Sequence, residues 1–346
     1  MKRQFAVVLV STSLLLASCH SNLDQKTDRQ TLHVAISPYQ DLAMLTTYKS
    51  LGLDHKEGIN LDLVTLQWED VIPSLASAGR TVDIGFGSLI EFLTKYPRLN
   101  AGASDPLVYV YPTYVFKGGG FVSFNAKVPN LDDQPSPPPP DVVRKFFSFR
   151  LGAQKSSMFD MLLFAVSEQA GIQRTNLKVM DIGMADGLLA AEHGSLDAAA
   201  AGLTQRNEAI EKGGRVVLTM EKFGFADLTG LICKRSTLDA RHADIEKLVR
   251  IWFQCVNFVY SDLDKNSSIP IQYLTQKSST QYTPASYKRA LEAEYLPRTL
   301  QDANRDLIAD SGQYSIHRIS DTTIKYLLKL GIVATPPPLP SPIEVR

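Results

Sequence analysis

The chain has 346 residues, of which 44% are hydrophobic and 21% are charged. This composition is typical of a soluble globular protein, and it excludes a disordered or membrane-embedded chain. The 36 basic residues balance 36 acidic ones and form no basic block, so we expect no nucleic acid as a partner. A single core stops growing at about 250 to 300 residues, so the length leaves room for two domains.

The first residues predict an export signal. A positive start is followed by an apolar run, 5–17, which is too short to span a bilayer but suits the core of a signal peptide. The end of this run, Leu16-Ala17-Ser18-Cys19, resembles a bacterial lipobox, whose cysteine is lipidated and becomes the new N-terminus. We therefore expect a lipoprotein signal peptide over 1–18, lipidation at Cys19 and a polar linker over 19–30. An ordinary signal peptide with an incidental cysteine is the alternative.

Three strands separated by helices are expected in the next part of the chain. Short apolar runs bounded by turn residues predict these strands at 31–37, 61–66 and 81–89. Helical spacing predicts helices at 42–51 and 70–78, and a further helix that starts at Ser88 and breaks at Pro97. This strand and helix order predicts parallel pairing with right-handed crossovers.

Three consecutive glycines, Gly118 to Gly120, interrupt an aromatic and β-branched stretch over 107–124. Because three glycines disfavour a regular strand interior, we expect a bend there, where the chain passes from one lobe to the other. A flexible surface turn is the alternative.

The second lobe repeats the strand and helix order. It follows a proline-rich stretch, 132–141, which predicts an extended surface insertion. Its expected strands are 148–153, 177–182, 198–201 and 215–219, and its expected helices are 158–171, 185–193 and 205–212.

Beyond a strand at 228–234 the chain becomes helical. Apolar spacing predicts helices at 243–263, 284–293 and 321–330, and we expect them to cover the first lobe. The first lobe would then comprise 31–117 and 228–334, and the second 118–227, so that the chain crosses twice between lobes. A proline-rich tail, 335–346, is expected to be peripheral.

Two stretches share a pattern in which an aspartate lies at a short strand that ends in glycine before a helix. These stretches are 81–89, which contains Asp83, and 190–202, which contains Asp197. In open α/β sheets, ligands bind at the carboxyl ends of the strands, so a cleft is expected there. The first stretch lacks the third glycine of a dinucleotide site, so we expect no such cofactor and a structural role for Asp83.

The cysteines and histidines predict no metal or catalytic centre. Cys233 ends an apolar strand-like run and Cys255 lies in an apolar helix, so two buried thiols are expected, with a disulfide as the alternative. No histidine has the spacing of a zinc ligand, and we expect neither a metal nor a cofactor.

The order of these runs resembles one known family over 32–331. The runs that carry the resemblance are 32–37, 52–59, 79–87, 119–122, 152–157 and 194–200. They are similar to bacterial substrate-binding proteins of the nitrate, sulfonate and taurine import group, which also includes a thiamine-precursor type. The resemblance implies an α/β fold, the two-lobed type II periplasmic-binding-protein fold, in which each lobe is a mixed sheet flanked by helices.

The same resemblance implies a function. A lipid-anchored, exported monomer of this kind closes on a small-molecule ligand, without a cofactor, and delivers it to a membrane permease powered by an ATPase. Closure is expected about the two crossings, near 116–122 and 223–229. Enzymes of the same fold, such as a sulfinate hydrolase or a pyrimidine synthase, are one alternative, although the cysteine-rich motif of the latter is absent. A surface lipoprotein without a transport role is another.

Candidate ligand-binding residues follow from the predicted strand ends. They are Ser37, Tyr39, Trp68, Gly87 and Ser88 on one wall, Ser156 and Ser157 on the other, and Thr204 and Arg206 at the closing edge. Helix starts favour anions, and aromatic rings stack on planar ligands. Helix capping by Ser88 and Ser157, a core position for Trp68 and a solvated charge for Arg206 are the alternatives. Because no pair of arginines falls in these loops, we favour an organic ligand with a planar or apolar part.

Overall fold

The computed structural model describes residues 31–345, apart from 78–80, 174–175 and 279–280. The described residues belong to one compact unit. The expected signal peptide, the linker and Cys19 lie outside the described residues.

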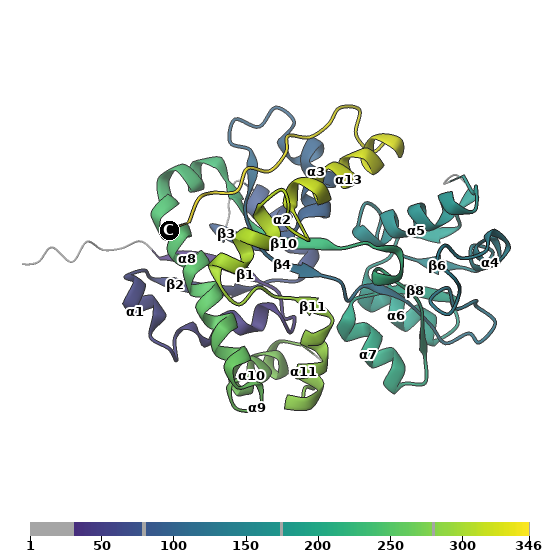
Figure 1. Cartoon of the computed structure of the whole chain (residues 1–346), viewed down its shortest axis with the longest axis horizontal. Coiled ribbons are helices and arrows are strands. Elements are labelled where there is room, and N and C mark those ends of the chain that lie inside the picture. The colour runs from purple at the N-terminus through teal and green to yellow at the C-terminus, as the bar shows by residue number, and fades with distance from the viewer. Residues whose placement is uncertain (1–30, 78–80, 174–175, 279–280, 346) are drawn as a thin grey trace, which may run out of the picture. The chain divides into compact units, whose positions relative to one another are not determined.

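A mixed sheet of six strands forms the core of the first lobe (Figure 1). Its order is β11-β4-β10-β3-β1-β2, with β1 (Leu32–Ile36), β2 (Leu61–Thr65), β3 (Ile84–Ser88), β4 (Leu107–Phe116), β10 (Asp227–Lys234) and β11 (Glu294–Tyr295). The strand β1 pairs in parallel with β2 and β3, as the alternation of strands and helices predicts. The strand β10 enters antiparallel between β3 and β4, which makes the sheet mixed.

Helices cover this sheet. They are η1 (Leu42–Tyr48), α1 (Leu53–Glu57), α2 (Trp68–Ala76), α3 (Leu89–Asn100), α8 (Arg235–Ser261), α9 (Leu263–Asn266), α10 (Ser268–Lys277), α11 (Pro284–Glu292), α12 (Leu300–Ala303), η4 (Asn304–Ile308) and α13 (Ile316–Lys329). The long helix α8 places Trp252 in the core. The centroid of its ring lies 5.0 Å from that of Phe86 of β3 and 6.0 Å from that of Tyr114 of β4, on which it stacks. The C-terminal helices therefore return to the first sheet, as expected.

A second mixed sheet, of five strands, forms the core of the other lobe. Its order is β7-β6-β8-β5-β9, with β5 (Gly120–Ser123), β6 (Leu151–Gly152), β7 (Val179–Met180), β8 (Ala198–Ala201) and β9 (Arg215–Thr219). Its helices are α4 (Pro140–Phe146), α5 (Met158–Gln169), α6 (Met184–Glu192), α7 (Leu203–Glu211) and η3 (Glu221–Phe223). The strands β6, β7 and β8 are parallel, and β5 and β9 complete the sheet in antiparallel pairs.

The chain passes between the two sheets twice, from β4 to β5 and from β9 to β10. The glycines of the first crossing are buried. A Cβ on Gly119 would lie 2.5 Å from the Met220 sulfur, and one on Gly120 would lie 2.4 Å from the Leu218 carbonyl oxygen. The glycines are therefore required by close packing at a crossing, and a flexible surface turn is excluded.

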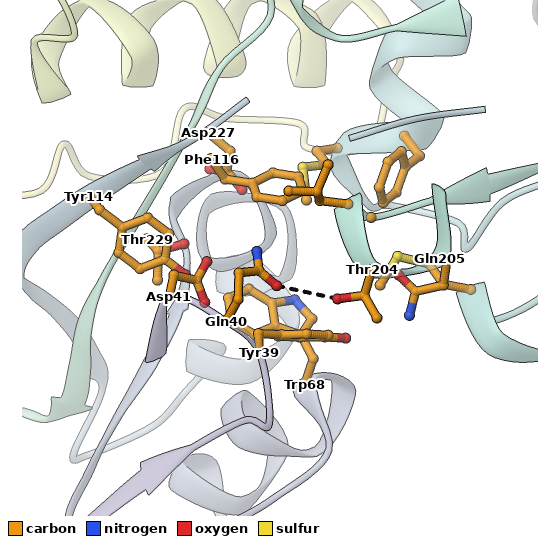
Figure 2. A pocket seen from close by; sticks show the side chains of 15 residues that line it. Tyr39, Gln40, Asp41, Trp68, Tyr114, Phe116, Thr204, Gln205, Asp227 and Thr229 are labelled. Carbon is orange, nitrogen blue, oxygen red and sulfur yellow. Dashed lines mark hydrogen bonds between the residues drawn. The ribbon is translucent and has the colours of Figure 1, made fainter. Parts of the chain in front are cut away.

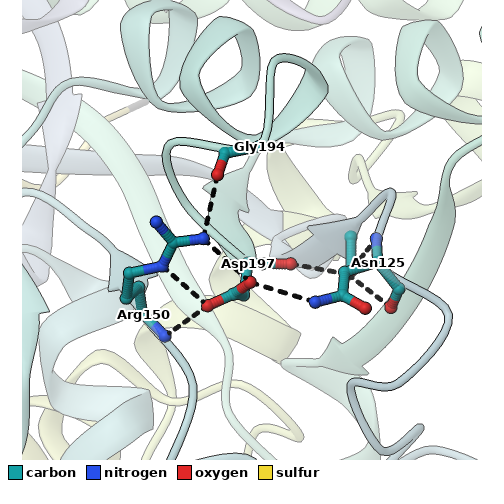
Figure 3. Close-up of polar contacts among 5 residues, drawn as sticks. Asn125, Arg150, Gly194 and Asp197 are labelled. Carbon is teal, nitrogen blue, oxygen red and sulfur yellow. Dashed lines mark hydrogen bonds and ion pairs between the residues drawn. The ribbon is translucent and has the colours of Figure 1, made fainter.

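The two aspartates that share a sequence pattern play the same structural role in the two sheets. Asp83 accepts from the backbone N–H of His33 at 2.9 Å, and its own N–H donates to the His33 carbonyl. Asp197 does the same with Arg150, and it also binds the Arg150 guanidinium and Asn125 (Figure 3). Each carboxylate ties the start of its strand to the parallel neighbour, so the expected structural role of Asp83 is confirmed.

Two helix predictions are corrected. The helix α3 continues through Pro97 to Asn100. The proline lies near the helix end, so its missing N–H removes one hydrogen bond only, and Asn100 then accepts from the N–H of Leu107 at 2.8 Å. The first helix is a 3₁₀ turn followed by α1, and in it the hydroxyls of Thr46 and Thr47 donate to the Ala43 and Met44 carbonyls. Such side-chain bonds compete with a regular α-helix.

The proline-rich segments are attached more firmly than expected. The insertion is held where Asp132 accepts from the N–H of Thr219 at 2.9 Å, and it ends in α4. The tail is not peripheral, because the Ile343 N–H donates to the Val110 carbonyl at 3.0 Å and Val345 is buried.

Candidate functional site

A cavity of about 480 Å³, counting the space open to solvent, lies between the two sheets (Figure 2). The first lobe lines it with Tyr39, Gln40, Asp41, Trp68, Tyr114, Phe116, Asp227 and Thr229, and the second with Met158, Phe159, Met184 and the start of α7, Gly202 to Gln205. Most of these residues lie at strand ends or helix starts, as a ligand site in an open α/β sheet requires.

The cavity adjoins a larger outer cleft of about 1710 Å³, also counting the open solvent. Both share Tyr39, Trp68, Met158, Phe159, Met184, Thr204 and Gln205. The outer cleft adds the acidic residues Glu69, Glu91, Asp186, Glu192 and Glu208 and the basic residues Lys212 and Lys277. A solute entering from the cleft therefore passes mostly acidic side chains before it reaches the inner cavity.

The loop after β1 places Asp41 at the inner cavity. Its carboxylate caps η1 by accepting from the Leu42 N–H at 2.7 Å, and the Tyr114 hydroxyl donates to it as well. The carboxyl group is fully buried, and this burial raises its pKa to about 6. Tyr287 supports the loop by donating to the Gln40 carbonyl at 2.7 Å. Asp41 is thus held in place by neutral groups.

Trp68 and Tyr39 form an aromatic wall. Their rings pack edge to face, with the ring centroids 5.9 Å apart. The Trp68 indole N–H donates to Glu91 at 3.2 Å, and Glu91 is paired with Lys95 at 3.0 Å. Both rings line the inner cavity and the outer cleft. The indole is therefore oriented by a partner of its own, with its ring available at the cavity.

Asp227, the first residue of β10, is the second carboxylate of the inner cavity. It accepts from the Ser88 hydroxyl and from the Ile90 N–H, the latter at 3.1 Å, and so it caps α3. Burial raises its pKa to about 7. Like Asp41, it is held by neutral donors and has no cationic partner among the described residues.

A polar contact joins the two lobes across the cavity. The Thr204 hydroxyl donates to the Gln40 side-chain oxygen at 3.2 Å and lies 2.9 Å from the Tyr282 hydroxyl (Figure 2). Gln205 follows it, and the buried side-chain oxygen of Gln205 has no partner among the described residues. The start of α7 therefore closes one side of the cavity and offers an unused acceptor.

Four of the predicted site residues line these spaces. Tyr39, Trp68 and Thr204 line both, and Ser157 lines the outer cleft. Ser157 also caps α5 by accepting from the Asp160 N–H at 3.4 Å. The prediction that they contact a ligand is consistent with this geometry and stays a prediction.

The other five predicted residues lie behind the walls. Ser37 is fully buried, and its hydroxyl has no hydrogen-bond partner among the described residues. A Cβ on Gly87 would lie 2.8 Å from Ile232, so Gly87 is packed within the sheet. Ser88 caps α3 by accepting from the Glu91 N–H at 3.0 Å.

Ser156 and Arg206 are likewise absent from the lining. Ser156 has a φ of 61°, and its N–H donates to Asp160 at 3.0 Å. Arg206 donates to the Gly118 carbonyl at 2.7 Å, and burial lowers the pKa of its guanidinium. Arg206 is thus a brace at the first crossing, and the alternative of a solvated charge is wrong.

Sequence reasoning missed Gln40, Asp41, Tyr114 and Asp227. Asp41 follows the strand-ending Ser37-Pro38-Tyr39 turn, and its position as a helix cap was a usable signal. Tyr114 lies in the middle of an aromatic strand, and nothing in the alternation of that strand distinguishes it. Asp227 opens the returning strand after the second crossing, so its proximity to α3 depends on the fold.

Cys233 and Cys255 are buried and no disulfide joins them, which confirms the expected buried thiols over the disulfide. Burial raises the pKa of the Cys255 thiol to about 12. Within the described part of the chain, no cluster of three or more His, Cys, Asp or Glu residues could hold a metal. No helix among these residues is long and apolar enough to cross a membrane.

No family model and no curated protein matches the sequence. Solved structures do match. The periplasmic aliphatic sulphonate binding protein SsuA of Escherichia coli has a TM-score of 0.65 at 15% identity, covering 88% of this chain and 94% of that one. The alkanesulfonate-binding protein SsuA of Xanthomonas axonopodis pv. citri, bound to MOPS, has a TM-score of 0.63 at 17% identity, covering 90% and 94%.

The periplasmic nitrate-binding protein NrtA of Synechocystis PCC 6803 has a TM-score of 0.63 at 12% identity, covering 88% of this chain and 83% of that one. These similarities, together with the two mixed sheets, establish a periplasmic-binding-protein fold. The fold class expected from the sequence is confirmed.

Proposed function

We propose that this chain is a solute-binding protein that captures a small molecule in the cavity between its two sheets. The observation that carries the proposal is the cavity itself, which residues from both lobes line at strand ends and helix starts. Its lining combines aromatic walls with a few fixed polar groups, as small-molecule sites do. The structurally similar proteins include a sulphonate binding protein and a nitrate-binding protein.

We also propose that the protein delivers its ligand to a membrane permease. The lipobox-like Leu16-Ala17-Ser18-Cys19 supports an exported chain anchored by a lipid at Cys19. An anchored solute-binding protein would hand its ligand to the permease of an ABC importer, and we propose that partner for this chain. The domains would be the predicted ones, 31–117 with 228–334 and 118–227, except that Asp227 opens β10 and belongs with the first.

Closure of the two lobes would trap the ligand. The two crossings, near 116–122 and 223–229, are the proposed hinges. The contact of Thr204 with Gln40 and Tyr282 joins the lobes across the cavity. A bound solute would add contacts to both walls and stabilise this closed arrangement.

The test is a thermal-shift screen of the purified mature protein against nitrate, sulfonates, pyrimidines, aromatic acids and organic amines. A ligand at 100 times its Kd stabilises a folded protein by about 2.7 kcal/mol, which gives a measurable rise in Tm. Small-angle scattering should then show a smaller radius of gyration with the ligand. A folded sample that no compound stabilises would contradict solute binding.

The enzyme alternative has less support from the described residues. Neither a cysteine nor a histidine is among those that line the inner cavity or the outer cleft. A nucleophilic mechanism requires a thiol or hydroxyl beside a base. Incubation with each stabilising compound, followed by mass spectrometry, would reveal turnover.

A further inference from the structure

The inner cavity has an unusual balance of charge. Its described lining contains two carboxylates, Asp41 and Asp227, and neither lysine, arginine nor histidine. Both carboxylates are almost fully buried. In the part of the chain that the structure describes, no ion pair involves either of them. An anionic solute would therefore meet two acids and no cationic side chain.

A buried carboxylate without a counter-ion is costly, because its hydration is lost and nothing replaces it. Hydrogen bonds from neutral groups compensate only in part. Asp41 accepts three such bonds, from the Leu42 N–H, the Tyr114 hydroxyl and its own backbone N–H, whereas the two oxygens of a carboxylate can accept about four. A cation in the cavity would supply the missing counter-ion.

The remaining lining suits the body of such a cation. Tyr39, Trp68, Tyr114, Phe116 and Phe159 provide five aromatic rings around the cavity. Ring faces attract a cation or stack on a flat ligand. Figure 2 shows Asp41 beside Tyr114 and Gln40, with Thr204 and Gln205 on the opposite side of the cavity. The unpartnered oxygen of Gln205 is a further acceptor for a ligand N–H.

We infer that the solute is a small organic cation with a flat or apolar body, whose charged nitrogen donates to Asp41 while its body lies against Tyr39 and Trp68. This inference rests on the proposed solute-binding function, and it names the ligand class. Asp41 carries the charge recognition, because it lies on the same loop as Tyr39, whereas Asp227 is bound to Ser88 and Ile90 at the start of α3. The outer cleft would attract the same class of ligand, because its five acidic residues outnumber Lys212, Lys277 and the Glu91 partner Lys95.

Three probes of similar size and different charge test the ligand class. They are benzylamine, benzyl alcohol and benzenesulfonate, titrated by calorimetry into the mature protein at pH 7.5. We expect benzylamine to bind at least tenfold more tightly than benzyl alcohol, and benzenesulfonate not to bind. Equal or tighter binding of the alcohol or the sulfonate overturns the inference, as does a lack of benzylamine binding.

These outcomes separate the ligand class from the function. Binding of benzenesulfonate or nitrate would overturn the inference that the ligand is a cation, while the proposed solute-binding function would stand. If no probe binds, and native mass spectrometry of the protein finds no small molecule retained from a cell extract, both are overturned.

A matched pair of variants locates the charge recognition. Asp41→Asn keeps the shape and the helix cap but removes the charge, and we expect it to bind benzylamine at least tenfold more weakly with benzyl alcohol unchanged. Asp310→Asn makes the same charge change at a side chain that is 92% exposed, and it should leave both affinities unchanged. Circular dichroism establishes that both variants fold. Unchanged benzylamine affinity in folded Asp41→Asn, or an equal loss in both variants, would refute the role of Asp41.

Discussion

Asp197 and Asp41 are two aspartates with opposite surroundings. Asp197 accepts from the Arg150 N–H at 2.9 Å, from the Arg150 guanidinium at 3.0 Å and from the Asn125 amide at 3.0 Å (Figure 3). The hydrogen bond from Arg150 is the main reason that its pKa falls to about 2. This carboxylate is fully occupied, and it fastens the second sheet.

Asp41 has no cationic partner among the described residues, and burial raises its pKa to about 6. Its charge costs free energy in the empty cavity, whereas the charge of Asp197 stabilises the fold. The two carboxylates differ in both burial and partners, because Asp41 is fully buried without a cation whereas Asp197 lies nearer the surface beside Arg150. A buried acid that the chain leaves without a counter-ion is the one available to a ligand.

Asp197→Ala should have the largest effect. It removes the acceptor of Arg150 and Asn125, and hydrogen bonds to charged groups contribute about 1.5 to 3 kcal/mol. We expect urea unfolding at pH 7 to show a loss of about 3 kcal/mol. Asp310→Ala, which removes an exposed carboxylate, should change the free energy of unfolding by less than about 0.5 kcal/mol. Equal losses in the two variants would show that the cluster in Figure 3 contributes nothing specific.

The same variant has a defined pH dependence. The pKa of Asp197 is about 2 in the folded protein against an ordinary 3.8. Its contribution is therefore complete above about pH 4 and is lost as the pH falls to about 2. The gap between wild type and Asp197→Ala should narrow over that range, measured by chemical denaturation. A gap that stays constant would contradict the lowered pKa.

Asp41→Asn should raise the free energy of unfolding in the absence of ligand, whereas Asp197→Ala lowers it. Below about pH 4 the Asp41 carboxyl is protonated in both the folded and the unfolded chain, so it costs nothing. Between about pH 4 and 6 only the unfolded chain loses the proton, and the wild type loses stability. We expect the variant to be more stable by about 3 kcal/mol at pH 7.5, because burial raises the Asp41 pKa from 3.8 to about 6, and close to the wild type at pH 3. A variant that is less stable at pH 7.5 would show that Asp41 is satisfied by its present partners.

The sequence predicts the two sheets and the structural aspartates, because the signals for these features are local. Strand and helix alternation predicts both sheets, and the glycine run predicts the first crossing. Asp83 and Asp197 share a visible pattern because each lies one residue before its strand, where a parallel neighbour always offers an N–H. Two α/β lobes follow from such local regularities, whereas the periplasmic-binding-protein fold class follows from the resemblance in the order and spacing of the runs.

The cavity could not be predicted in the same way. Asp41, Tyr114 and Asp227 meet only because β10 returns from the second lobe and inserts between β3 and β4. Ser88 and Gly87 looked like wall residues, yet the same insertion covers them with Asp227 and Ile232. The sequence places Arg206 at the closing edge of the site, but its guanidinium donates to the Gly118 carbonyl at the first crossing. Long-range pairing decides each of these positions.

Trp68→Ala should separate binding from stability. The substitution removes one aromatic wall of the cavity, and we expect affinity for a solute found in the thermal-shift screen to fall about tenfold. The ring is only partly buried, so the free energy of unfolding should fall by only about 1 kcal/mol. Phe149→Ala, which removes a partly buried ring outside the lining of both spaces, is the matched control and should leave affinity unchanged. A collapse of stability in Trp68→Ala would place the indole in the core instead of the site.

Deletion of the tail, 335–346, should have the smallest effect and should leave the cavity untouched. The tail contributes the backbone hydrogen bond from Ile343 to Val110 and buries Pro337, Pro340 and Val345, while Leu339 is 48% exposed. Docking of this kind stabilises by about 1 kcal/mol once the entropy of ordering the segment is subtracted. Thermal unfolding of the truncated chain should therefore show a slightly lower Tm, and Leu339→Ala should show none of this loss. The tail contacts β4 at Val110, on the same strand as Tyr114, which lines the cavity. We expect solute affinity to be unchanged in the truncated chain, so that the tail contributes to stability alone. An altered affinity would contradict this and would mean that β4 transmits the change to the cavity.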